Sequence, residues 1–343
     1  MNLAEAPPLA LPGFVQIEPV GQCNLACRMC PVAYRDETGR GKPQAFMSFE
    51  TFRRLLDEFP AVSVLQLQGL GEPMLHPRFF DMVRYAAGKG ITVSTNSNLT
   101  ALSERRAEEC VTSGLARLYV SLDAAGKAAY EYIRTGARFE RVLRNLRRVL
   151  AARKRLGGGP EVHLVAVAMR RNLRELPALV RLAHDEGVDG LSVQHLCHDF
   201  REPTLPGRYA PMRAFVDAET LAGEAPEAVS ASFAEARRLA QALRVPLRLP
   251  NERNLVPAAG EAAASKRGLR CDWPWQGAYV SYRGDAMPCC MVATPDRVNF
   301  GNMAREGVRA VWENDAYQRF RARLASDEPP DICRGCALYN GRF

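Results

Sequence analysis

The sequence contains no long hydrophobic run, because no stretch of about 18 consecutive apolar residues occurs in it. Its N-terminus also lacks the basic segment ahead of an apolar one that a secretory signal peptide needs. The sequence therefore predicts neither a membrane span nor export, and we expect a cytoplasmic protein. With 343 residues, of which 47% are hydrophobic, the chain is long enough for one large domain and a smaller one.

A pattern typical of nucleic-acid binding is also missing. The formal charge of +8 would suit a nucleic acid or another anionic ligand. However, basic residues such as Arg138, Arg141 and Arg144 lie among acidic neighbours, and no aromatic residues alternate with them. We interpret the charge as a general enrichment in arginine, so a nucleic acid is not an expected partner.

The chain has ten cysteines but no export signal, which argues against a disulfide framework, because cytosolic thiols are kept reduced. Seven of the ten fall into two groups with the spacing of metal ligands. Metal ligation is therefore the favoured interpretation. The remaining cysteines are Cys110, Cys197 and one of the adjacent pair Cys289 and Cys290.

Short apolar or alternating segments recur from residue 14 onward, and helical patterns separate them. The six segments are FVQIEPV, VSVLQLQG, ITVSTN, ARLYVSLD, EVHLVAVAM and DGLSVQHL. This alternation predicts parallel strands joined by helices, which we expect near residues 48–59 (with Ser48 as N-cap), 77–88, 103–113, 139–155 and 173–186. Six units are too few to close an eight-stranded barrel. We expect an α/β fold, a partial (β/α)6 TIM-like barrel with its active site at the carboxyl ends of the strands.

Four regions follow from this pattern. We expect an N-terminal extension at residues 1–13, the partial barrel at residues 14–200, a linker or substrate-covering insertion at residues 201–265, and a small module at residues 266–343. The insertion contains a helical pattern near residues 232–243 and the strand-like VPLRLP. In the last region, AYVSYRGDAMPCC predicts a hairpin that turns at residues 283–285, followed by a helix near residues 308–324.

The first cysteine group consists of Cys23, Cys27 and Cys30, spaced C-x3-C-x2-C directly after the first strand. Thiolates stabilise iron-sulfur clusters, and three of them can hold three irons of a cubane while the fourth iron stays open to another ligand. The alternative, a zinc knuckle, usually pairs two C-x2-C halves or adds histidine, and no histidine lies near this loop. The loop therefore favours a catalytic [4Fe-4S] cluster.

A C-x3-C-x2-C loop after the first strand of a partial barrel resembles the radical S-adenosylmethionine (SAM) superfamily, and the resemblance covers about residues 14–200. It implies that SAM chelates the open iron and that an electron from the reduced cluster cleaves SAM to methionine and a 5′-deoxyadenosyl radical. It also implies an electron donor such as flavodoxin or ferredoxin. Many members carry an aromatic residue just before the third cysteine, where this chain has Met29.

The same resemblance implies a set of SAM contacts. QGLGEP is similar to the GGEP-type motif that lines the pocket for the amino group of SAM, although it also reads as a glycine turn. Short polar residues follow the third and fourth strands, where the sugar and methionine parts of SAM would lie, although each is also a common helix-capping residue. The expected cofactor-binding residues are Gly69, Gly71, Glu72, Thr95, Asn96, Ser121, Asp123 and Arg134, the last resembling an arginine that meets the carboxylate of SAM.

The second cysteine group reads C-x17-C-x43-C-x2-C and consists of Cys271, Cys289, Cys333 and Cys336. Four thiolates would stabilise a small module with little core of its own, whether they bind iron or, as the alternative, zinc. The pattern resembles the shortened SPASM module, called twitch, which holds one auxiliary [4Fe-4S] cluster. Cys290 could replace Cys289 as the ligand.

Complete ligation of the auxiliary cluster by cysteine implies an electron conduit, which suits oxidation of a substrate radical. Alternatively, a cysteine thiol returns a hydrogen atom from the opposite face and gives an epimer. Cys197 and Cys290 are the candidate catalytic thiols, and their other interpretation is that of small buried hydrophobic residues. His195 and His198 flank Cys197 and are candidates for a general base.

Three functions remain open at this point. The first is an oxidoreductase or epimerase that acts on a polar small molecule, such as a sugar or aminocyclitol intermediate of a natural product. It is favoured because only about thirteen residues precede the first strand, which leaves no room for a peptide-recognition domain there. The second is a maturase that modifies a ribosomally made peptide or protein. The third is a non-catalytic zinc or iron-sulfur protein.

Overall fold

The computed structural model describes residues 9–35, 45–196, 200, 202–251 and 271–340. Six parallel strands follow one another in chain order and form the centre of a single sheet. They are β1 (Phe14–Ile17), β2 (Val64–Gln66), β3 (Thr92–Ser97), β4 (Leu115–Ser121), β5 (Glu161–Ala168) and β6 (Gly190–His195). This order confirms the α/β fold and the partial barrel that the alternating pattern predicted.

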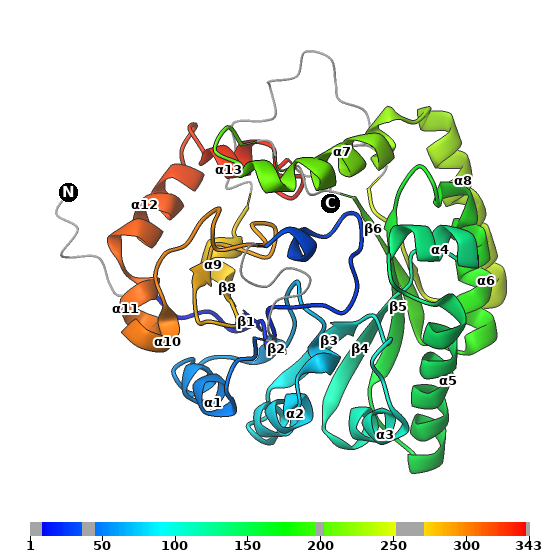
Figure 1. Ribbon diagram of the computed structural model, residues 1–343, viewed down its shortest axis with the longest axis horizontal. Coiled ribbons are helices and arrows are strands. Elements are labelled where there is room, and N and C mark those ends of the chain that lie inside the picture. Colours follow the sequence, from blue (N-terminus) through cyan, green and yellow to red (C-terminus); the bar gives the residue numbers. More distant parts are fainter. Residues whose placement is uncertain (1–8, 36–44, 197–199, 201, 252–270, 341–343) are drawn as a thin grey trace.

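Helices separate these strands and follow one another around the outside of the curved sheet (Figure 1). They are α1 (Phe49–Asp57), α2 (Phe79–Gly88), α3 (Glu104–Thr112), α4 (Lys127–Ile133), α5 (Phe139–Leu156) and α6 (Leu176–Glu186). The side chain of Ser48 caps α1 by accepting a hydrogen bond from the Thr51 backbone N–H at 3.0 Å, as predicted. Among the described residues, no helix combines the length and the apolar character that crossing a bilayer requires.

The sheet continues beyond β6, which the sequence did not predict. Strand β7 (Leu247–Arg248) pairs parallel with β6, and the preceding helix α8 (Pro226–Leu243) packs against α6. The region expected to be a linker or insertion therefore adds α8 and a short strand to the barrel layer, and it also contains α7 (Ala210–Glu219). The expected boundary at residue 200 stays a prediction, since one sheet runs through it.

The C-terminal region joins the same sheet at its other edge. Strand β8 (Gly277–Val280) pairs parallel with β1, and β9 (Ala286–Met287) pairs antiparallel with β8, so the predicted hairpin is present. The predicted single helix over residues 308–324 is wrong, because it is divided into α11 (Val308–Trp312) and α12 (Asp315–Leu324). Asn314 separates the two and caps α12 by accepting from the Tyr317 N–H at 2.9 Å. The region also contains α9 (Trp273–Gln276), α10 (Met303–Glu306) and α13 (Asp331–Arg334).

The two faces of the sheet differ in polarity. One row of paired residues across β1 to β4 is apolar and belongs to the core that the outer helices share: Val15, Leu65, Val93 and Leu115. The residues of the next paired row face the opposite side and are polar: Gln16, Gln66, Ser94, Arg117 and Glu161 on β5. A register shift between β3 and β4 places Arg117, and not Ala116, in this row. Because helices cover the outer face, the polar row lines the inside of the partial barrel, which suits a polar ligand.

Candidate active site

The three-cysteine loop lies between β1 and a short 3-10 helix at Pro31–Tyr34, and in Figure 1 this dark blue chain crosses the middle of the ring of elements. Two backbone hydrogen bonds fasten the loop to the end of α4. The Ala26 N–H donates to the Thr135 carbonyl at 2.9 Å, and the Arg28 N–H donates to the Ile133 carbonyl at 3.1 Å. A small cavity of about 70 Å³ adjoins Cys23, Thr135 and other residues of the loop.

The three thiols occupy a buried setting that fits metal ligands. Cys23, Cys27 and Cys30 form no disulfide. Burial raises the pKa of all three, to about 12 for Cys27, and neighbouring thiols and carboxylates contribute further. Binding of iron would replace the protons that burial holds on these sulfurs, which is the way metal binding couples to thiol pKa. The donor set therefore fits a three-cysteine iron-sulfur cluster.

Among the described residues, no three Cys, His, Asp or Glu side chains lie close enough together to hold a single metal ion. In a cubane, each thiolate binds a different iron, so the ligands stand farther apart than those of one ion.

Glu72 joins the loops that follow β2 and β3. Its buried carboxylate accepts hydrogen bonds from the Ser97 hydroxyl at 2.7 Å and from the Asn98 backbone N–H at 2.8 Å. Burial raises its pKa, while these hydrogen bonds oppose the shift. The Asn98 side-chain amide in turn lies 3.5 Å from the sulfur of Cys23. Glu72 thus holds Asn98 beside the first cluster site, and its expected contact with the SAM amino group stays a prediction.

Gly69 and Gly71 allow two loops to approach each other closely. A Cβ atom at Gly71 would lie 2.2 Å from the Val20 carbonyl oxygen, and one at Gly69 would lie 2.1 Å from Cγ of Glu18. Both glycines are therefore needed for packing against the chain that leads into the cysteine loop. Their expected backbone contacts with SAM stay a prediction.

Thr95 and Asn96, which were both expected to contact SAM, face opposite sides of the sheet. Asn96 and Ser121 are half-buried on the inner face of the sheet, where SAM was expected. Thr95 is completely buried, and its hydroxyl donates to the Leu67 carbonyl at 2.9 Å. Because successive strand residues point to opposite faces, Thr95 faces away from Asn96, and the expected contacts of both residues with SAM stay predictions.

Asp123 and Arg134 form a buried ion pair. Arg134 Nε lies 2.7 Å from one Asp123 carboxylate oxygen, and the other oxygen accepts from the Val167 N–H at 2.9 Å. Burial disfavours the charged guanidinium and so lowers the pKa of Arg134. The negative charges of Asp123 and then of Cys27 have the larger combined effect, so the pKa of Arg134 is raised. Asp123 is fully buried in this ion pair, and its expected direct contact with SAM stays a prediction. It holds Arg134 beside Cys27.

The structure gathers the second cysteine group together with Cys290. Burial raises the pKa of Cys289, Cys290 and Cys333, and the nearby Cys336 raises the pKa of each of the three further. Burial also raises the pKa of Cys271, and Cys336 again contributes to the rise. Five thiols, none of them in a disulfide, therefore lie around the closing C-x2-C turn. This donor set fits a four-cysteine cluster with one thiol to spare.

We expect Cys289→Ala to lose the second cluster and Cys290→Ala to keep it. The prediction follows the C-x17-C-x43-C-x2-C spacing, in which Cys289 is the second ligand, and Cys333 and Cys336 both contribute to its raised pKa. Anaerobic iron analysis should fall from about eight irons per chain to about four in Cys289→Ala alone. Cys110→Ala is the matched control, because Cys110 is fully buried on α3 and belongs to neither cysteine group. Loss of four irons in Cys290→Ala, with the full iron content in Cys289→Ala, would make Cys290 the ligand and remove it as a candidate hydrogen donor.

The other candidate catalytic thiol, Cys197, lies outside the described residues, as does His198. His195 is described, and its Nε2 lies 3.1 Å from the Asn251 carbonyl oxygen. Burial lowers its pKa, which favours the neutral ring. The proposed roles of Cys197 and Cys290 in hydrogen return stay predictions.

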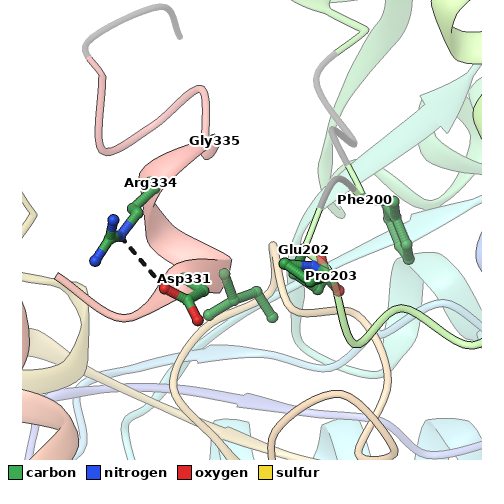
Figure 2. A pocket seen from close by; sticks show the side chains of 7 residues that line it. Phe200, Glu202, Pro203, Asp331, Arg334 and Gly335 are labelled. Carbon is green, nitrogen blue, oxygen red and sulfur yellow. Dashed lines mark ion pairs between the residues drawn. The ribbon is translucent and has the colours of Figure 1, made fainter. Parts of the chain in front are cut away.

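A pocket of about 430 Å³ lies between the segment after β6 and α13, which carries Cys333. Figure 2 shows that segment facing the helix, on which Asp331 and Arg334 form an ion pair at 3.3 Å. Its lining residues are Phe200, Glu202, Pro203, Asp331, Ile332, Arg334 and Gly335. Sequence reasoning missed this pocket, because its two walls come from segments about 130 residues apart.

Comparison with known protein families agrees with both cysteine groups. The model of the radical SAM superfamily matches residues 17–183, and that of the SPASM iron-sulfur cluster-binding domain matches residues 271–337. These two domains imply SAM and two iron-sulfur clusters as cofactors.

Similar proteins cover different shares of the chain. The tungsten-containing aldehyde ferredoxin oxidoreductase cofactor-modifying protein of Pyrococcus furiosus is 29% identical over 192 residues, which are 53% of this chain and 51% of that protein. The PqqA peptide cyclase of Xanthomonas campestris pv. campestris is 26% identical over 344 residues, which are 96% of this chain and 79% of that protein.

The fold is shared with SuiB of Streptococcus suis bound to its precursor peptide SuiA. The TM-score is 0.69 at 15% identity, over 97% of this chain and 71% of that one. The two matched domains, together with the parallel partial barrel and the two cysteine groups, identify the family: the chain belongs to the radical SAM superfamily and carries a C-terminal SPASM iron-sulfur cluster-binding domain.

Proposed function

We propose that this radical SAM enzyme oxidises a ribosomally made peptide or protein by removing a hydrogen atom from one of its residues. The observation that carries the proposal is the similarity to a PqqA peptide cyclase along 96% of this chain. SuiB, which shares the fold, is also described with a precursor peptide. These relatives favour a peptide over the polar small molecule that the sequence first suggested.

The chain supplies the setting for this chemistry. When bound, SAM and the first cluster supply a 5′-deoxyadenosyl radical, and the second cluster supplies an acceptor for the second electron. Cys23, Cys27 and Cys30 would hold the first cluster. Asp123 keeps the Arg134 guanidinium beside Cys27, where it favours negative charge. Such prepositioned charge needs no rearrangement at the moment of reaction.

The pocket between the segment after β6 and α13 suits one residue of a peptide. Its volume of about 430 Å³ falls within the usual size range of small-ligand sites. Phe200 and Ile332 provide apolar surface, while Asp331 and Arg334 provide polar groups that can orient a peptide backbone. Glu202 is held by Arg297, whose Nη2 lies 2.9 Å from its carboxylate, so this wall is fixed before a ligand arrives. Cys333, an expected ligand of the second cluster, lies on the same helix as Asp331 and Arg334, which supports a substrate position near that cluster.

The test uses the anaerobically reconstituted enzyme with SAM and a reductant, either dithionite or the expected flavodoxin or ferredoxin. The substrates are synthetic peptides encoded by short reading frames next to the gene. We expect one of them to lose two hydrogen atoms by mass spectrometry, with formation of one 5′-deoxyadenosine per modified peptide. Cys27→Ala, which removes a ligand of the first cluster, is the control and should produce neither.

Deuterated substrates separate the alternatives. Deuterium that passes from a labelled peptide into 5′-deoxyadenosine supports the proposal. A peptide whose mass is unchanged in ordinary water but rises by one deuterium in deuterated water would identify epimerisation in place of oxidation. Transfer of deuterium from a labelled sugar or aminocyclitol, with every peptide left intact, would overturn the proposal and restore the small-molecule hypothesis.

A further inference from the structure

Glu18 is a buried carboxylate at the end of β1, and sequence reasoning gave it no role. Arg35 Nη2 lies 2.9 Å from one of its oxygens, and the Tyr279 hydroxyl donates to the same oxygen at 2.7 Å. The backbone N–H of Leu70 also donates to Glu18 at 3.2 Å. The side chain of Glu18 is 0% exposed. This one buried carboxylate therefore accepts hydrogen bonds from three separate parts of the chain.

These three parts are the two cluster regions and the loop between them. Arg35 follows the three-cysteine loop, Leu70 lies in the loop after β2, and Tyr279 lies on β8 of the SPASM domain. Arg35 also reaches the SPASM domain directly, because its Nη2 donates to the Ala293 carbonyl at 2.6 Å. Glu18 and Arg35 therefore join the first cluster site to the module that holds the second.

The backbone is shaped around this junction. A Cβ atom at Gly69 would collide with Glu18, and one at Gly21 would lie 2.4 Å from the ring of Tyr282. The Tyr282 backbone N–H also lies 3.4 Å from the Glu18 carboxylate. Glycine at these positions lets the core and the SPASM hairpin touch without intervening side chains.

Each end of the network adjoins a cysteine group. Arg35 follows Cys30 by five residues, and its backbone N–H donates to the Val32 carbonyl at 3.5 Å. Tyr279 packs in one hydrophobic cluster with Cys289 and Cys290. The series Arg35, Glu18, Tyr279 thus connects one cluster site to the other.

A buried ion pair contributes little to the free energy of folding on balance. Moving two charges out of water costs several kcal/mol per ion, and well-packed apolar residues are often as stable or more stable. Such a pair instead specifies one arrangement, because any displacement leaves a buried charge without its partner. Three partners converging on one carboxylate fix the relative position of the parts that they belong to.

We infer that Arg35, Glu18 and Tyr279 form a positioning network that fixes the distance between the two iron-sulfur clusters. The inference rests on the presence of two clusters and not on the class of substrate. With the network intact, the second cluster stays at a constant separation from the site where the radical forms. Loosening it should let SAM cleavage proceed without matching product formation.

The experiment compares Tyr279→Phe and Glu18→Gln with the wild-type holoenzyme. Both variants should retain the full iron content. Electron paramagnetic resonance measures the magnetic interaction between the two reduced clusters. In both variants we expect the splitting that this interaction causes to become smaller or more widely distributed. Without substrate, the 5′-deoxyadenosine formed per chain should rise several-fold. A role in folding stability alone would lower the melting temperature and leave the cluster spectra of the folded protein unchanged.

Tyr85→Phe is the matched control, because its hydroxyl makes a similar bond to Asp57 at 2.6 Å on the outer helices. It should leave the spectra unchanged. If Glu18→Gln fails to fold, Tyr279→Phe still decides, since it removes one hydroxyl and keeps the ring. Wild-type spectra and wild-type SAM cleavage in Tyr279→Phe would overturn the inference. None of these measurements needs a peptide, so failure of the proposed function would leave them unaffected.

Discussion

Replacing Gly71 with alanine should remove the first cluster while the second cluster remains. The new Cβ would lie 2.2 Å from the Val20 carbonyl oxygen and 2.8 Å from the Gln22 carbonyl oxygen. Both contacts are with backbone, so no side chain can rotate to relieve them. The strain would displace the chain immediately before Cys23. Because a shift of about 1 Å can cost about 100-fold in rate, 5′-deoxyadenosine formation should fall by at least that factor.

Iron content distinguishes this effect from general unfolding. The purified Gly71→Ala protein should hold about four irons per chain in place of about eight. Gly88→Ala is the matched control, since nothing lies within 4 Å of a Cβ at Gly88. Gly88 is the last residue of α2, where alanine should stabilise the fold by up to about 1 kcal/mol. Full iron content and normal SAM cleavage in Gly71→Ala would show that the loop tolerates displacement.

The local part of the fold could be predicted from the sequence. The apolar period of each helix and caps such as Ser48 and Ser103 are encoded within a few residues, and both serines cap as their positions suggest. The pairing of β8 with β1 could not be predicted, because the two strands lie more than 250 residues apart. Strand β7 is only two residues long and gives little periodic signal. Non-local pairing of this kind depends on tertiary packing.

The candidate active site shows the same difference between local features, which the sequence predicts, and non-local contacts, which it does not. The cysteine groups are visible because ligand spacing is a short-range pattern, and both matched domains include them. The contacts near SAM depend on which face a strand residue occupies, and a shift of one residue exchanges Thr95 and Asn96. Glu18 was missed because its partners lie outside the local pattern, with Arg35 17 residues and Tyr279 261 residues further along the chain. The available signal was a charged residue inside the apolar segment FVQIEPV.

Replacing Asp123 with alanine should destabilise the fold by about 3–5 kcal/mol, the cost of removing one partner of a buried ion pair. Arg134 would keep its charge in a site where its side chain is only 11% exposed. The Val167 N–H would also lose the acceptor that it reaches at 2.9 Å. Denaturant unfolding under anaerobic conditions measures the loss. Asp123→Asn should cost less, because its side-chain oxygen can still accept from Val167 while only the charge is lost.

Glu161→Ala is the matched control for this prediction. Glu161 also pairs with an arginine, at 2.9 Å from Arg117 Nε, but both side chains are about half exposed. Water can solvate the remaining Arg117, so the change should cost about 0–1 kcal/mol. Equal costs for Asp123→Ala and Glu161→Ala would mean that Arg134 finds another partner. A normal free energy of unfolding combined with a raised KM for SAM would instead make Asp123 a direct cofactor contact, against its buried position.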